Sequence, residues 1–152
     1  MTTLVVLDNP ANSSQRTISY IKTIGKKTQS QQIILLNLTD LSEDFVLQHL
    51  TSDPSLVTYV NGFELYTKID EQFIEIIKTW LETLVQNNPR IPLLEYSRLS
   101  EQNFSITPFQ NLKRLHLISY VINEYAPTSV LYIGTGAICD CIQPLCQQTS
   151  TP

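Results

Sequence analysis

The sequence is poor in charged side chains and has no excess of basic ones. Of its 152 residues, 16% are charged, the formal net charge is −4 and the isoelectric point is about 5.0. A protein that binds nucleic acid through phosphates needs clustered Lys and Arg side chains. Here basic residues adjoin only at Lys26-Lys27 and Lys113-Arg114. The composition therefore argues against a general nucleic-acid binder.

Long apolar runs and paired cysteines are also missing. No stretch approaches the ~20 apolar residues that cross a bilayer. The first apolar run, Leu4 to Leu7, is too short for a signal peptide and is followed by Asp8. The chain has three cysteines, and an odd number fits a reducing compartment better than a disulfide framework. These absences predict a cytoplasmic protein that does not enter a membrane.

Hydrophobic residues make up 42% of the chain, which is typical of a folded protein. At 152 residues the chain is long enough for one sizeable core. We therefore expect a single α/β domain over residues 1–146 and a flexible C-terminal tail over residues 147–152.

Short apolar, β-favouring runs alternate with helical patterns along the chain. Strands are expected at 4–7, 33–36, 56–60, 91–94 and 129–133. Helices are expected from Ser13 or Ser14 to a closing Gly25, and over 43–50, 70–86, 108–125 and 137–146. This alternation predicts a three-layer, mostly parallel five-stranded sheet with helices on both faces, flavodoxin-like or Rossmann-like. The flavodoxin-like strand order would be 2-1-3-4-5.

The dipeptide Asn61-Gly62 has two interpretations. Asn-Gly between β-like runs is a strong hairpin signal, so Phe63–Tyr66 would pair with the preceding strand. Alternatively, the dipeptide is the loop between a parallel strand and a helix. The sequence leaves both open.

In an open parallel sheet, ligands bind beyond the carboxyl ends of the strands. One loop there, residues 12–17, is rich in hydroxyl groups and opens a helix, which suits an anion, although a simple Ser N-cap is the more common explanation of such a sequence. The loop resembles the phosphate-binding loop of flavodoxins, which implies FMN or a nucleotide as cofactor. The candidate cofactor-binding residues are Ser13, Ser14, Thr17, Asn61, Gly134, Thr135 and Gly136.

The last three of these residues follow a continuous apolar strand. Val130 to Gly136 resembles the first glycine motif of class I methyltransferases, which implies binding of S-adenosylmethionine. A tight turn after a buried strand is the other explanation of Gly134-Thr135-Gly136.

Aromatic side chains gather in the neighbouring segments. Tyr59, Phe63, Tyr66 and Tyr96 would stack on a flavin in the flavodoxin resemblance, and if exposed they would form a contact patch for a protein partner. Tyr59 equally suits the core.

The three cysteines, Cys139, Cys141 and Cys146, follow the pattern C-x-C-x4-C. Three thiolates bind zinc if a fourth ligand is supplied. Neither histidine of the chain, His49 or His116, is obviously placed to supply it. We therefore predict no metal site and keep these cysteines as the weaker alternative.

The sequence contains no P-loop, no H-E-x-x-H motif and no nucleophile elbow. Receiver domains share the strand–helix layout, but of their acidic residues only Asp8 has a counterpart here. We therefore assign no catalytic residues.

Three functions remain. The first is a non-catalytic module for protein–protein interaction or assembly. The second is a flavin- or nucleotide-binding domain with its ligand at the carboxyl ends of the strands. The third is the incomplete nucleotide-binding half of a larger transferase.

Overall fold

The computed structural model describes residues 1–8, 14–28, 31–87, 107–134 and 138–149, and every structural statement below concerns these residues. The strands are β1 (Thr2–Leu7), β2 (Gln32–Asn37), β3 (Val57–Asn61) and β4 (Ser129–Ile133). The helices are α1 (Ser14–Lys27), α2 (Glu43–Leu50), α3 (Gly62–Asn87), α5 (Thr107–Tyr125) and α6 (Ile138–Thr149), and a single 3-10 turn, η1 (Pro54–Leu56), precedes β3.

The four strands form one parallel sheet in the order β3-β2-β1-β4. Val5 in β1 lies between Leu35 in β2 and Leu131 in β4. The α/β class is therefore confirmed, and four of the five expected strands are present. The expected order 2-1-3-4-5 is wrong for these strands, because β3 lies beside β2 and not beside β1. The fifth expected strand, 91–94, falls outside the described residues.

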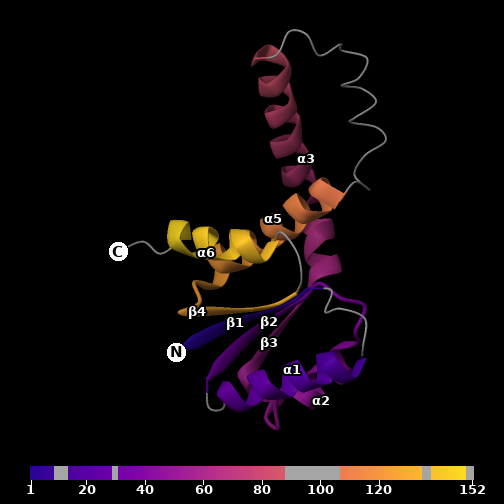
Figure 1. The fold of residues 1–152 in the computed structure, drawn as a ribbon, viewed down its shortest axis with the longest axis vertical. Coiled ribbons are helices and arrows are strands. Elements are labelled where there is room, and N and C mark those ends of the chain that lie inside the picture. The colour runs from indigo at the N-terminus through magenta and orange to yellow at the C-terminus, as the bar shows by residue number, and fades with distance from the viewer. Residues whose placement is uncertain (9–13, 29–30, 88–106, 135–137, 150–152) are drawn as a thin grey trace.

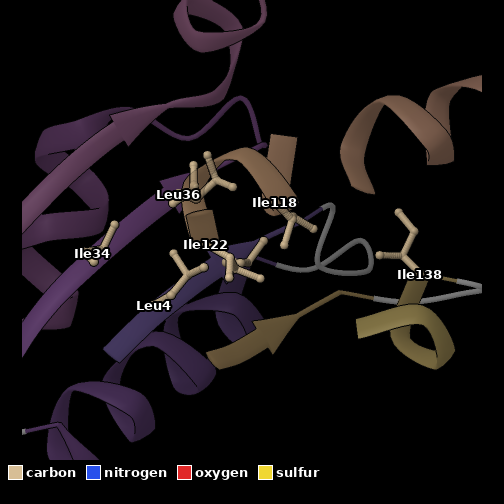
Figure 2. Packing of buried hydrophobic residues seen from close by; sticks show 8 residues of the cluster. Leu4, Ile34, Leu36, Ile118, Ile122 and Ile138 are labelled. Carbon is tan, nitrogen blue, oxygen red and sulfur yellow. The ribbon is translucent and has the colours of Figure 1, made fainter. Parts of the chain in front are cut away.

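Successive side chains of β1 supply both faces of the sheet, because side chains alternate along a strand. Leu4 and Val6 pack with side chains of α5 and α6, and Figure 2 shows Leu4 beside Ile122 of α5. Val5 and Leu7 pack with side chains of α1 and α2 on the other face. All four β1 side chains are fully buried, as expected for a strand covered on both faces.

The helix after β3 begins earlier than the apolar pattern predicts. It starts at Gly62, not at Asp70. The Asn61 side-chain oxygen accepts hydrogen bonds from the backbone N–H groups of Phe63 (2.9 Å) and Glu64 (3.4 Å), so Asn61 is the N-cap of α3. Asn61-Gly62 is therefore a strand-to-helix connection and not a hairpin.

Two glycines allow backbones to approach closely. A Cβ atom on Gly62 would lie 2.7 Å from the Asn37 carbonyl oxygen, at the end of β2. A Cβ atom on Gly25 would collide with the Leu50 carbonyl oxygen at the end of α2. Gly25 does not close its helix as expected, because α1 continues to Lys27.

Figure 1 shows α1 and α2 on one side of the sheet and α5 and α6 on the other. The 26-residue α3 leaves the carboxyl end of β3 and extends well beyond the other elements. Helix α6 contains Pro144 and runs to Thr149, three residues into the expected tail. Among the described residues, no helix combines the length and apolar character needed to span a bilayer.

Candidate functional site

The carboxyl ends of the four strands meet at one edge of the sheet, because all four strands are parallel. Asp8 follows β1, Leu38 follows β2, Gly62 follows β3 and Gly134 follows β4. The N-terminal part of α5 reaches the same edge, since Arg114 contacts Asp8. This edge brings the polar groups described below together.

Asp8 is a buried carboxylate between β1 and β4, with a relative exposure of 1%. Its backbone N–H donates to the Ile133 carbonyl oxygen at 2.8 Å. The Tyr132 hydroxyl donates to Asp8 Oδ2 at 2.7 Å, and Arg114 Nε lies 3.3 Å from Oδ1. Oδ1 accepts no hydrogen bond within the described structure. A buried carboxylate needs such partners, because burial of an unpaired charge is costly.

A hollow of about 250 Å³ opens beside this ion pair. Its wall contains loop residues that follow β2 and β3, the first turn of α3 and the N-terminal half of α5. The lining residues are Leu38, Gly62, Phe63, Tyr66, Gln110, Lys113, Arg114 and Leu117. The wall therefore combines two aromatic rings with an ammonium and a guanidinium group.

Lys113 and Tyr66 form the side of the hollow where α5 meets α3. Lys113 Nζ lies over the Tyr66 ring, 2.7 Å from its centroid, which is a close cation–π contact. Burial raises the pKa of Tyr66 to about 12, and a hydrogen bond with Asp70 and the charge of Asp70 act in the same direction. Burial lowers the pKa of Lys113, whereas the Asp70 charge acts in the opposite direction. Tyr66 is therefore a neutral hydrogen-bond donor at physiological pH.

His116 lies one turn further along α5. Its ring is 5.7 Å from the Phe73 ring of α3, and its buried Nε2 has no hydrogen-bond partner in the described structure. Burial lowers the pKa of His116, so the neutral imidazole is favoured. It does not line the hollow.

Of the expected cofactor-binding residues, the structure describes the side chains or backbone positions of Thr17, Asn61 and Gly134. Thr17 is buried against the rest of the fold with 4% exposure, and the Asn61 oxygen is occupied by the α3 backbone. A Cβ atom on Gly134 would lie 2.5 Å from the Tyr132 hydroxyl oxygen, so this glycine admits the tyrosine ring. Ser14 is the first residue of α1, but its side chain lies outside the described residues, as do Ser13, Thr135 and Gly136.

Three of the four aromatic residues of the expected patch lie in the described structure. Phe63 is 64% exposed, and it lines the hollow together with Tyr66. The Tyr59 hydroxyl accepts a 2.9 Å hydrogen bond from Asn37 Nδ2, and its ring packs with the core on the α1 and α2 face. Tyr96 lies outside the described residues. Two of the four aromatic residues therefore share a surface.

The sequence-based reasoning missed the basic part of the site. Lys113 and Arg114 are visible in the sequence as one of two adjacent basic pairs. What the sequence does not show is that α5 places them at the carboxyl ends of the strands, against Asp8 and Tyr66.

Cys141 is exposed and Cys146 is half-buried. In the described ranges, no three His, Cys, Asp or Glu side chains are grouped so as to hold a metal ion. The Cys139 side chain lies outside those ranges, so the C-x-C-x4-C interpretation stays a prediction.

Comparisons with known proteins gave no match for this chain: no family model, no curated protein and no solved structure is similar to it.

Proposed function

We propose that this chain is a nucleotide-binding α/β domain, and that the hollow at the carboxyl ends of the strands holds a mononucleotide such as AMP or FMN. The observation that carries the proposal is the composition of this hollow. Phe63 and Tyr66 offer aromatic surface to a planar ring, and Lys113 and Arg114 offer donors to a phosphate group.

The order of the strands reverses near this hollow, whose own strand-end residues are Leu38 after β2 and Gly62 after β3. The order β3-β2-β1-β4 corresponds to the first four strands of the Rossmann order 3-2-1-4-5-6. In such sheets the ligand crevice forms where the order reverses, and here the reversal falls between β1 and β4. The Asp8–Arg114 ion pair stands at that point. The third function, a nucleotide-binding half of a larger transferase, would use this same crevice.

The size of the hollow limits the ligand. Small-molecule sites commonly measure ~300–1,000 Å³. A hollow of about 250 Å³ fits one mononucleotide better than a dinucleotide such as FAD or NAD.

The side-chain charges around the hollow limit the charge of the ligand. The carboxylates of Asp8 and Asp70 balance the two cations, so the surroundings of the hollow carry no large positive charge. A monophosphate therefore suits the site better than a triphosphate. Gln110 adds an amide group to the wall, and amide groups read the polar edge of a base.

The test is a thermal-shift series followed by calorimetric titration with AMP, GMP, CMP, UMP and FMN. A ligand at one hundred times its Kd stabilises the folded state by ~2.7 kcal/mol, which is readily detected. Phe63→Ala should weaken binding about tenfold, because loss of a stacking ring costs ~1–3 kcal/mol. Tyr20→Ala is the matched control, since Tyr20 is a comparably exposed aromatic residue outside this hollow. The absence of any shift with all five compounds would refute the proposal.

A non-catalytic protein-interaction module is the second candidate, and the exposure of Phe63 favours it. A ring that is 64% exposed beside a concave wall resembles the aromatic anchors of protein interfaces. To test it, tagged protein is purified from its native cells, and the bound proteins are compared among wild type, Phe63→Ala and Tyr20→Ala. A partner lost only from Phe63→Ala supports this function. A set of partners unchanged by Phe63→Ala contradicts it.

The remaining sequence-based expectations stay proposals. They are a fifth strand at 91–94 in a three-layer fold, one domain over 1–146, and a cytoplasmic location.

A further inference from the structure

The Tyr66 ring is covered on one face by the side chain of Lys113, and both residues line the proposed nucleotide site. Lys113 Nζ lies 2.7 Å from the centroid of the ring. Aromatic rings that stack keep their centroids ~4.5 Å or more apart. The ammonium group therefore occupies the space that a planar base would take on this face of Tyr66.

The other aromatic ring of the wall is accessible. Phe63 lines the same hollow and is 64% exposed. It stands three positions before Tyr66 in the first turns of α3, and residues at this spacing are neighbours on a helix surface. Phe63 can stack on a ligand in the structure as it stands, whereas Tyr66 offers the covered face only after Lys113 has moved.

The charges around Lys113 favour its movement towards a phosphate group. Arg114 follows it in the chain and lines the same hollow, with its Nε held by Asp8. Burial lowers the pKa of Lys113, and the charge of Asp70 partly compensates for that burial. A phosphate in the hollow would give the partly buried ammonium group a further charged partner.

The strengths of the two contacts point in the same direction. A hydrogen bond to a charged group changes an equilibrium constant roughly tenfold or more. A cation–π contact at an exposed site is worth about two- to fivefold. The ammonium group should therefore leave the ring when a phosphate is present and remain on it when none is.

We propose that Lys113 makes this hollow selective for mononucleotides over nucleosides, because the phosphate draws the ammonium group off Tyr66 and so exposes the ring to the base. A nucleoside carries no phosphate, so it must displace Lys113 from the ring without compensation. Recognition of the phosphate and recognition of the base are coupled through one side chain. This role of Lys113 rests on the proposed nucleotide-binding function, to which it adds the residue that determines the class of ligand.

The first test follows the Lys113 side chain of the wild-type protein by NMR. Methylene protons that lie over an aromatic ring are shifted upfield by its ring current, and Tyr66→Leu should abolish the shift and so identify these resonances. Inorganic phosphate or AMP should move them back towards their ordinary positions, whereas chloride at equal ionic strength should not. Resonances that neither phosphate nor AMP moves would overturn the proposal.

The second test compares AMP with adenosine, and FMN with riboflavin, by calorimetric titration. Lys113→Ala should bind the nucleotide about tenfold more weakly, because a charge-assisted hydrogen bond is lost. The same variant should bind the nucleoside about fivefold more tightly, because the Tyr66 ring is uncovered for stacking. A merely structural role of Lys113 would weaken both ligands. Lys113→Arg keeps a cation that can lie over the ring and should retain the preference for the nucleotide.

Lys68→Ala is the matched control, because Lys68 is an exposed lysine of α3 that is not among the described lining residues of the hollow. It should leave the ratio of the nucleotide and nucleoside affinities unchanged. A wild-type protein that binds neither nucleotide would refute the proposed function and this role of Lys113 together. If wild type binds a nucleotide but Lys113→Ala gains no affinity for the nucleoside, the role of Lys113 alone is overturned and the proposed function stands.

Discussion

The hydroxyl group of Tyr132 donates a 2.7 Å hydrogen bond to the carboxylate of Asp8, which joins the end of β4 to the end of β1. The two residues lie 124 positions apart in the chain. Gly134 makes this contact possible, because a larger residue would collide with the Tyr132 ring. At the proposed ligand edge, a buried, charge-assisted hydrogen bond thus adds to the backbone pairing of β1 with β4.

Tyr132→Phe should destabilise the protein by ~1.5–3 kcal/mol, because the variant removes a donor from a buried carboxylate. Urea denaturation followed by circular dichroism measures the change. Tyr125→Phe is the control, since Tyr125 is 41% exposed and lies at the far end of α5. An unchanged midpoint for Tyr132→Phe would show that Asp8 does not depend on the hydroxyl.

Gly25→Ala should destabilise the protein, although helix propensity alone predicts a gain of ~1 kcal/mol at a helix-interior glycine. The added methyl group collides with the Leu50 backbone, and forced overpacking costs ~1–3 kcal/mol. Denaturant titration gives the sign of the change. Lys22→Ala, an exposed substitution in the same helix, should leave stability nearly unchanged. A more stable Gly25→Ala protein would mean that α1 and α2 are further apart than described.

Asn61→Ala should cost about 1 kcal/mol, because α3 loses its N-cap. Asn61→Asp should retain stability, since a carboxylate also accepts these backbone hydrogen bonds and favours a helix N-terminus. Thermal unfolding of the two variants measures the difference. If Asn61 instead contacts a ligand, Asn61→Asp would repel a phosphate and weaken nucleotide binding without lowering stability.

Stability should fall at alkaline pH through Tyr66. Burial, aided by Asp70, raises the pKa of Tyr66 from 10.0 to about 12, so the folded state keeps the phenol proton that the unfolded state releases. This contribution is fully present below pH 10 and is lost as the pH rises towards 12. Denaturation midpoints between pH 9 and 12, chosen to bracket these two values, should decline less in Tyr66→Phe than in wild type. Parallel declines in the two proteins would contradict the raised pKa.

The strands were the most predictable part of the fold, because residues that are buried on both sheet faces read as continuous apolar runs. Leu4–Leu7 and residues 33–36 are examples, and both lie in the sheet where the runs are. The order of the strands was not predictable, since β3 has the same local sequence whether it pairs with β2 or with β1. The two arrangements differ only in the position at which each crossover connection adds the next strand to the sheet.

The start of α3 was unpredictable from the sequence for a different reason. Phe63, Glu64 and Leu65 alternate with a period of two, whereas Phe63 and Tyr66 have the spacing of one helical turn, and four residues are too few to separate the two periods. Asn is favoured both in hairpin turns and at helix N-caps. The contact between Gly62 and Asn37, which lies in another strand, distinguishes the two structures, and no local pattern encodes it.

The candidate site lies at the sheet edge that the general rule for parallel sheets predicts, and its lining includes some residues that the sequence suggested and others that it did not. The edge was predictable, and Phe63 and Tyr66 were identified from their aromatic character. Lys113 and Arg114 were not assigned to the site, because they lie inside a helix whose neighbours the sequence does not reveal. The structural role of Asp8 depends on its contacts with Arg114 and Tyr132, and both residues are far from Asp8 in the sequence.

The length of α3 has a mechanical consequence. At 1.5 Å per residue its 26 residues span ~39 Å, and its first turn forms part of the wall around the hollow. A rigid rod amplifies rotation at its base, so a 10° tilt at the Phe63 end would move the Asn87 end by ~7 Å for a helix of this length. A small movement of side chains at the base of α3, with no change in the sheet, would therefore displace the far end of the helix. That displacement would be large enough to change a contact with another molecule.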